Sequence, residues 1–283
     1  MLASFMNNLE FTLVVGICSI LAGLLGSLSG LGGGVILVPM LTLGFGVDIR
    51  YAIGASLVSV IATSSGAAIA YVRQGYTNIR LGMLLEIATT FGAVFGASVA
   101  AIAPTRIIAI VFGAMLLISN YLANQPHLKH AISFPTNPLA TRLKLNGSYP
   151  TLDGDEAYCV QNVLGGFLLM IVAGITSGLL GIGSGALKVL AMDRVMQLPF
   201  KVSTTTSNFM IGVTAAASAG IYFSRGYIDP ELCMPVVLGV LLGAWYGARL
   251  LVKLNTKMLH AIFSILILTI GVQMIYKGFT GDL

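Results

Sequence analysis

The stretch Gly30-Leu31-Gly32-Gly33-Gly34 returns 151 residues later as Gly181-Ile182-Gly183-Ser184-Gly185. Each copy interrupts an apolar run, and a glycine inside a helix costs about 1 kcal/mol relative to alanine. Within a bilayer, no water satisfies the backbone groups that such a break exposes. We therefore expect both glycine stretches to lie inside the protein or along a polar cavity.

The composition indicates a protein that crosses a membrane several times. Of the 283 residues, 57% are hydrophobic and 9% are charged, whereas a soluble domain has about 25% charged residues. The net charge of +5 indicates basic cytoplasmic loops rather than a nucleic-acid partner, because no basic patch alternates with aromatic residues. The first apolar run lacks a basic leader, so we expect no cleaved signal peptide.

Ten apolar segments can be drawn, five on either side of a polar middle. A full crossing needs about 20 residues, and the second segment of each half is shorter than that. We expect an all-α polytopic membrane protein with about eight full spans and two short or re-entrant segments beside the glycines. The segments are 10–28, 34–46, 51–72, 80–102, 105–122, 160–180, 185–197, 202–223, 231–252 and 257–277.

The polar middle, residues 123–159, separates two transmembrane repeats, 1–122 and 160–283. It contains four prolines and much of the clustered charge, so we expect a linker loop outside the membrane that acts mainly as a plain tether. If each half crosses the membrane an odd number of times, ten Lys and Arg residues fall on one side and four on the other. The positive-inside rule then makes the linker cytoplasmic. Both termini become periplasmic, in a multi-pass protein of the cell inner membrane.

A shift of 151 residues aligns Gly30 to Phe112 with the second half without a gap. An odd number of crossings orients the two halves oppositely. Inverted repeats with glycine-broken helices are typical of secondary transporters, whose sites lie where the repeats meet. The paired residues include Ser56 with Ser207, Thr63 with Thr214, Tyr71 with Tyr222, Gly92 with Gly243, and Gly96 with Gly247.

The glycine stretches and the hydroxyl-rich third segments are the candidate substrate site. A helix that restarts after a break presents N–H groups that favour an anion, and hydroxyls can donate to its oxygens. Alternatively, the glycines only allow close helix crossing and the hydroxyls bond their own helices. The candidates are Gly30, Gly32, Gly33, Gly34, Ser56, Gly181, Gly183, Ser184, Gly185, Lys188, Thr204, Thr205, Thr206, Ser207 and Asn208.

Two charged residues, Glu86 and Lys188, lie within apolar runs and have no counterpart in the other half. Charges inside membrane segments are rare and indicate function by default. We expect Lys188 to attract the anion or take part in proton transfer, and Glu86 is the candidate for proton coupling. Snorkelling of Lys188 and an interfacial position of Glu86 are the alternatives.

The chain has no nucleophile, zinc-protease or nucleotide-binding motif, so we expect no enzyme activity, cofactor or metal. The three cysteines, Cys18, Cys159 and Cys233, are too widely spaced for a metal motif. The expected partners are a small anionic substrate, membrane lipid and a coupling ion, either a proton or sodium. The oligomeric state stays open.

The motifs resemble those of a known family. Gly30–Gly34 with Pro39, followed by Ala52-Ile53-Gly54-Ala55-Ser56-Leu57, resembles the first-half motif of the sulfite exporter TauE/SafE family. Gly181–Gly185 and Ser203–Asn208 resemble its second-half counterpart, and the resemblance covers nearly the whole chain outside the linker. Leu190 replaces the proline in the second half, so we expect no matching proline kink there.

This resemblance implies an inner-membrane carrier for sulfite, sulfoacetate or another organosulfonate, driven by an ion gradient. Together with the repeat, it predicts a secondary transporter that works by alternating access. Two alternatives stay open at this point. One is a passive anion channel, and the other is an importer of the thiosulfate type that relays its substrate through cysteines.

Overall fold

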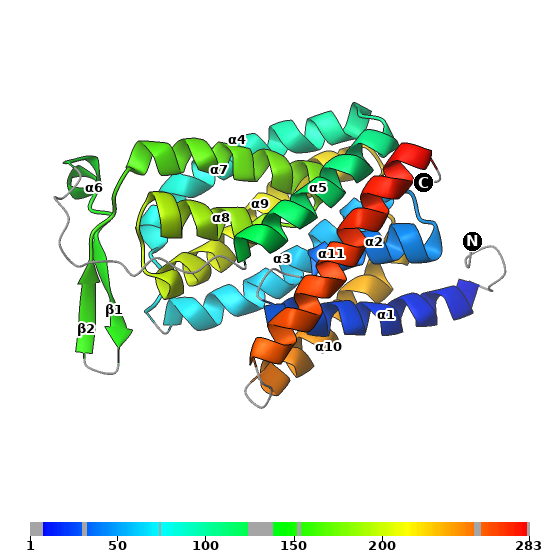
Figure 1. The fold of residues 1–283 in the computed structure, drawn as a ribbon, viewed down its shortest axis with the longest axis horizontal. Helices are drawn as coiled ribbons and strands as arrows, with labels where there is room; N and C mark the ends of the chain where they lie inside the picture. The colour runs from blue at the N-terminus through cyan, green and yellow to red at the C-terminus, as the bar shows by residue number, and fades with distance from the viewer. Residues whose placement is uncertain are drawn as a thin grey trace.

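The computed structural model describes residues 8–29, 33–73, 75–123, 138–151, 154–251 and 256–281, so the candidates Gly30 and Gly32 lie outside the described residues. The structure is almost entirely helical (Figure 1), in agreement with the predicted all-α class. The first half contains α1 (Asn8–Ser29), α2 (Gly34–Pro39), the π-helical turn η2 (Met40–Gly44), α3 (Ile49–Arg73), α4 (Ile79–Ile102) and α5 (Thr105–Ala123).

The second half contains the same succession of long and short helices. Four helices of the described chain, α4, α5, α7 and α10, are long and apolar enough to cross a membrane, and shorter apolar stretches lie in α1, α2, α3 and α11. The elements are α7 (Val163–Leu180), α8 (Gly185–Leu190), the π-helical turn η3 (Ala191–Val195), α9 (Phe200–Ser224), α10 (Pro230–Leu251) and α11 (Thr256–Thr280).

The two short helices begin where the glycine stretches end, at Gly34 and Gly185. Both widen into a π-helical turn at equivalent places, after Pro39 in one half and after Leu190 in the other. Because Leu190 is not a proline, proline is not the common cause of this change. Such π-helical turns are frequent at functional sites.

Helices of the first half pack against helices of the second. The α1 helix contacts α10, and α4 contacts α7. A Cβ added to Gly92 would lie 2.2 Å from the carbonyl oxygen of Ile171, and one added to Gly96 would lie 2.1 Å from that of Ile175. Glycine therefore lets α4 approach α7 closely. Gly92 and Gly96 of α4 meet Ile171 and Ile175 of α7 in the same order, so the two helices run in the same direction.

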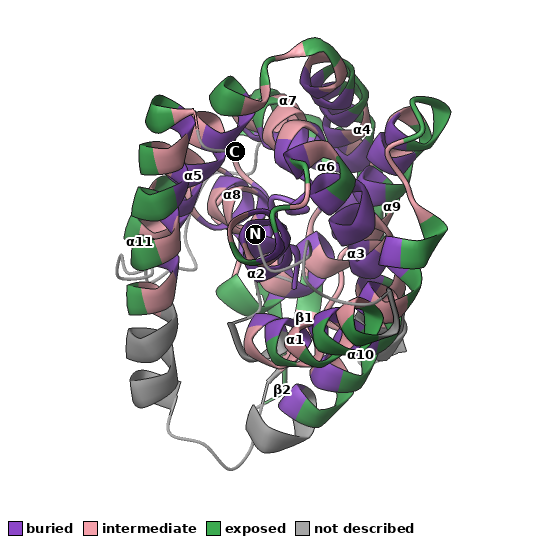
Figure 2. Ribbon diagram, turned by 90° about the vertical axis from the view of Figure 1, so that its right-hand side faces the viewer, coloured by how far each residue is buried: buried purple, intermediate pink, exposed green. Residues whose placement is uncertain are grey.

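Burial is concentrated at the centre of the helix bundle, where α2, α3 and α9 are largely buried (Figure 2). The outward faces expose large apolar side chains, as expected of helices that face lipid tails. These exposed side chains include Phe91, Phe95, Leu164, Phe223 and Ile265.

The described part of the linker is folded. It contains the short helix α6 (Pro138–Arg142) and an antiparallel hairpin of β1 (Gly147–Thr151) and β2 (Gly154–Tyr158). Ala140 and Leu145 are buried in a cluster with residues of α4, η3 and α9. The prediction of a plain tether is therefore wrong for the described residues 138–151 and 154–159, because these two apolar side chains pack against the helix ends.

Asn78 fastens this folded linker to the helices. Its side-chain oxygen accepts from the N–H of Leu81 and caps α4. Its Nδ2 donates to the carbonyl of Leu145 at 2.7 Å and to the hydroxyl of Tyr158 at 2.9 Å. Burial raises the pKa of Tyr158 although the hydrogen bond from Asn78 opposes the shift. One short polar side chain thus both begins α4 and holds the hairpin.

Candidate functional site

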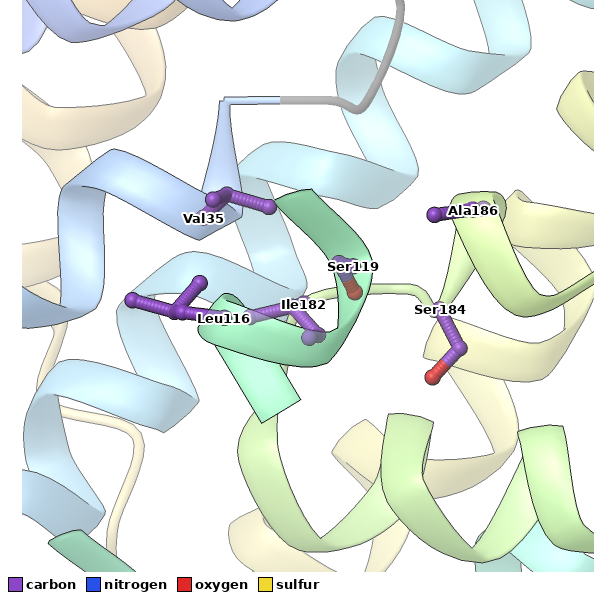
Figure 3. Close-up of a pocket in the computed structure, with 7 residues that line it drawn as sticks. Val35, Leu116, Ser119, Ile182, Ser184 and Ala186 are labelled. Atoms are coloured by element: carbon purple, nitrogen blue, oxygen red, sulfur yellow. The ribbon is translucent and has the colours of Figure 1, made fainter. Parts of the chain in front are cut away.

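A pocket lies beside the second glycine stretch, between helices of the two halves (Figure 3). Val35 of α2 and the side chains of Leu116 and Ser119 of α5 border it from the first half. The space around it that no atom fills is about 280 Å³, including the part open to solvent. The second half contributes Ile182, Ser184, Gly185 and Ala186.

The second glycine stretch has the backbone geometry that its composition predicts. Gly181 and Gly183 have φ values of +67° and +72°. Ser184, which lies between α7 and α8, also has a positive φ of +47°. Glycine adopts this left-handed conformation at no steric cost. Ser184 is held by a 2.9 Å hydrogen bond between its hydroxyl and that of Thr176 on α7.

The α8 helix starts at this pocket. Its first intrahelical hydrogen bond runs from the N–H of Lys188 to the carbonyl of Ser184 at 3.1 Å. The three preceding N–H groups are those that a helix start leaves without an intrahelical partner. Helix α8 and η3 form one continuous helical segment whose first residue is Gly185. The N-terminal end of a helix carries a partial positive charge, and here that end faces the pocket.

The candidates Gly34 and Ser56 meet the second half at the same place. The Ser56 hydroxyl donates to the carbonyl of Gly181 at 2.8 Å, and a Cβ on Gly34 would lie 2.6 Å from that hydroxyl oxygen. Ser207 donates to the carbonyl of Gly185 at 3.3 Å. Both serines therefore use their protons to hold the glycine stretches, and neither lines the pocket.

The threonine run at the start of α9 does not reach the pocket. Thr204 donates to carbonyls of its own helix. Thr205 donates to the carbonyl of Tyr76 at 3.1 Å, and Thr206 accepts from the N–H of Asn78 at 3.1 Å. These hydroxyls hold the connection between α3 and α4. Asn208, one turn further, is half-buried, and Gly33 precedes α2 as its N-terminal neighbour.

The two charged candidates meet on opposite sides of one hydroxyl. The ammonium of Lys188 donates to Thr214 Oγ1 at 2.6 Å, and the Thr214 hydroxyl donates to Glu86 Oε1 at 2.7 Å. Lys188 is 0% exposed and Glu86 is 8% exposed. Neither snorkelling of Lys188 nor an interfacial position of Glu86 fits this burial, so both residues belong to one internal cluster.

Comparison with known proteins agrees with the motifs. The model of the family described as "Sulfite exporter TauE/SafE" matches residues 15–274. The chain belongs to the TauE/SafE family. "Probable membrane transporter protein YunE" of Bacillus subtilis (strain 168) is 29% identical over 95% of this chain and 99% of its own length. "Probable membrane transporter protein MJ0441" of Methanocaldococcus jannaschii is 24% identical over 96% and 97%. No solved structure matches the chain.

Several residues of this TauE/SafE protein complete the site although the sequence did not single them out. Ser119 lines the pocket from α5, and Thr176 holds Ser184. Thr214 stood in the repeat alignment opposite Thr63, but that pairing gave no sign of its role between two charges. Ser119 and Thr176 lie in apolar helices where a lone hydroxyl ordinarily bonds its own helix, so their sequence carried no signal.

Proposed function

We propose that this TauE/SafE membrane protein is a secondary transporter for a small sulfur-containing anion, such as sulfite, sulfoacetate or another organosulfonate. It moves the anion across the inner membrane by alternating access between two oppositely oriented repeats. The observation that carries the proposal is the pocket where the Ser184 turn and the start of α8 meet α5 of the first half.

The packing of the helices supports two equivalent, inverted halves. The contact of α1 with α10 has its counterpart in the contact of α7 with α4. If α4 runs opposite to α1, then α7, which runs parallel to α4, also runs opposite to α1. Contacts of this kind let one half rock against the other around a site between them.

The chemistry of the pocket supports an anion. The hydroxyl of Ser119 and the first N–H groups of α8 are donors, and donors recognise oxyanion oxygens; the Ser184 hydroxyl, bonded to Thr176, borders the same space. Lys188 adds a buried positive charge one turn along the same helix. Val35 and Leu116 form an apolar side that fits the carbon of a small organosulfonate.

The arrangement in Figure 1 supports the proposed orientation. The linker hairpin lies at one end of the bundle, whereas the start of α1 and the end of α11 lie at the other. Arg142 and Lys144 belong to the hairpin end. The positive-inside rule places this end in the cytoplasm and both termini in the periplasm. Reporter fusions at the two termini and at residue 153 test this orientation.

Transport itself is tested with purified protein in liposomes. We expect saturable uptake of radiolabelled sulfite or sulfoacetate, and faster uptake when the unlabelled anion is inside, because a carrier exchanges its substrate. Protein-free liposomes measure passive leakage. If neither anion shows counterflow, the proposed substrate class is wrong, and if the protein gives single-channel currents, the channel alternative replaces the carrier.

The site assignment is tested by removing the pocket hydroxyls. We expect Ser119→Ala and Ser184→Ala each to lower kcat/KM for the anion about tenfold, because a hydrogen bond to a charged group contributes roughly 1.5–3 kcal/mol. Ser98→Ala is the matched control, since Ser98 is exposed on α4 and bonds only the carbonyl of Val94. Wild-type kinetics in both pocket variants would place the substrate elsewhere.

The cysteine-relay alternative is tested separately. Cys18, Cys159 and Cys233 are free thiols, and Cys233 is buried in α10 while Cys159 is exposed beside the hairpin. A carrier that binds its substrate through hydroxyl and amide groups needs none of them. We expect the triple Cys→Ser variant to retain transport, and loss of transport by a correctly folded triple variant would favour the relay.

A further inference from the structure

Lys188, Thr214 and Glu86 form a buried charge cluster that does not line the substrate pocket. It joins α8, α9 and α4, and therefore both halves of the chain. The Thr214 oxygen accepts from Lys188 at 2.6 Å, and its proton is donated toward Glu86 at 2.7 Å. The carbonyl of Met210 lies farther from the same hydroxyl, at 3.0 Å, so this one hydroxyl links an ammonium group to a carboxylate.

The two charges of this cluster compensate one another. A charged group deep in a protein is costly unless an opposite charge accompanies it. The Lys188 ammonium and the Glu86 carboxylate attract one another electrostatically. The other charged side chains described on the elements around the cluster are Arg50 of α3, Arg80 of α4, Arg106 of α5, Asp193 and Arg194 of η3, Lys201 of α9, and Arg225 at the end of α9.

The carboxylate of Glu86 keeps one oxygen unused. Oε1 accepts from Thr214 and, at 3.3 Å, from Thr90. Oε2 is buried and has no hydrogen-bond partner among the described residues. A buried ionised carboxylate with an unpaired oxygen is costly, and one added proton on Oε2 relieves this cost because it removes the charge of the carboxylate.

We propose that Glu86 Oε2 binds the proton that drives transport, and that Lys188 passes the effect of this proton to the anion pocket. The inference rests on the proposed function and names its coupling ion. When Glu86 is ionised, its charge cancels that of Lys188, and the pocket has little attraction for an anion. When Glu86 is protonated, Lys188 keeps its positive charge without a counter-charge, and an anion restores neutrality.

The position of Lys188 allows this transfer of charge. Its N–H bonds to the carbonyl of Ser184, so the pocket lies one helical turn away along α8. Lysine side chains in a helix lean toward its N-terminus, which is the pocket end of α8. Two unit charges this close interact by several kcal/mol where water is scarce. One proton is then taken up for each negative charge that binds, and linkage makes the effect reciprocal.

The same geometry favours a proton over sodium. A sodium ion bound at this cluster would take the oxygens of Glu86 and Thr214 as ligands. The Lys188 ammonium already occupies the Thr214 oxygen as a hydrogen-bond donor. A second cation beside it would meet the repulsion of a buried like charge, whereas a proton on Oε2 would not.

Liposomes with an inward proton gradient test the inference with sulfoacetate as the probe. The wild-type protein should accumulate it, and its apparent affinity should rise roughly tenfold per unit fall in pH while Glu86 is ionised. Glu86→Gln copies the protonated carboxyl group, so it should retain counterflow but lose accumulation and pH dependence. The matched control is Glu231→Gln. Glu231 lies at the exposed start of α10 in the second half, so this variant should behave as the wild type.

The possible results separate the two proposals. Absence of counterflow in the wild type overturns the proposed function and this inference with it. Counterflow with proton-driven accumulation that persists in Glu86→Gln overturns the inference alone, as does accumulation driven by sodium without a pH gradient. If Glu86→Gln does not elute as a folded protein, Lys188→Gln gives the second test, because it should weaken anion binding at least tenfold at low pH.

Discussion

Ser56 and Gly181, 125 residues apart, are joined by a 2.8 Å hydrogen bond from the serine hydroxyl to the glycine carbonyl. The bond connects the third helix of the first half to the end of α7 in the second. It is fully buried, since Ser56 is 0% exposed. A carbonyl at the left-handed end of a helix needs such a partner, and here the other half of the protein provides it.

Ser56→Ala should destabilise this junction more than it affects binding. Removal of the hydroxyl deprives the buried carbonyl of Gly181 of its hydrogen bond from Ser56, at a cost of about 1–3 kcal/mol. We expect Tm to fall by several degrees, measured by thermal unfolding in detergent. Ser65→Ala is the matched control on the same helix, because Ser65 is exposed and bonds only Ile61. Equal Tm values for the two variants would contradict the role of Ser56.

Gly92→Ala should disturb the packing of α4 against α7. The new Cβ would lie 2.2 Å from the carbonyl oxygen of Ile171 and 2.9 Å from the N atom of Ile175, and backbone atoms cannot turn aside. We expect a loss of about 1–3 kcal/mol in unfolding free energy, as for other overpacked sites.

Gly220→Ala is the control for this prediction. Gly220 lies in α9, and a Cβ there would have no atom within 4 Å. Alanine should leave the stability unchanged or raise it by up to about 1 kcal/mol through helix propensity. Comparable losses in the two variants would show that glycine at position 92 does not serve close packing.

Asn78 should prove to have two separable roles. Asn78→Asp keeps an oxygen to cap α4 but cannot donate to Leu145 and Tyr158, so we expect faster proteolysis of the linker hairpin with little change in Tm. Asn78→Ala also removes the cap and should cost about 1 kcal/mol more. Limited proteolysis followed by mass spectrometry measures the first effect, and thermal unfolding measures the second. Unchanged cleavage in Asn78→Asp would show that other contacts hold the hairpin.

Thr214→Val should uncouple Lys188 from Glu86 while it preserves the shape of the side chain. Both charged groups would lose a hydrogen bond, and bonds to charged groups contribute about 1.5–3 kcal/mol each. We expect proton-driven accumulation of the anion to fall at least tenfold in liposomes. Thr63→Val is its counterpart in the repeat, and Thr63 bonds only carbonyls of its own helix. If both variants transport equally well, Thr214 is not the link.

The class of protein and the places where its helices break follow from local chemistry along the chain. Apolar runs, scarce charge and the two glycine stretches predicted a helical membrane protein whose short helices begin at Gly34 and Gly185, and the structure confirms these starts. These features are readable because they depend on local chemistry. Bilayer thickness sets the length of an apolar run, and the backbone of glycine sets where a helix stops.

The fold of the linker could not be predicted from its local sequence. The described residues 138–151 and 154–159 have weak periodicity and two prolines, yet they fold because Ala140 and Leu145 are buried against distant helix ends. The threonine run of α9 gives the same lesson. Thr205 and Thr206 bond the turn before α4, and no local pattern indicates which way such hydroxyls turn.

The composition of the site depends on contacts between helices that are far apart in the chain. The sequence offered Glu86 and Lys188 as separate charges in unrelated positions, and it paired Thr214 with Thr63 as a mere repeat match. Folding brings α4, α8 and α9 together, so that one threonine hydroxyl lies between the two charges. The energy of a buried charge depends on what surrounds it in space, and that environment comes from residues more than 100 positions away in the chain.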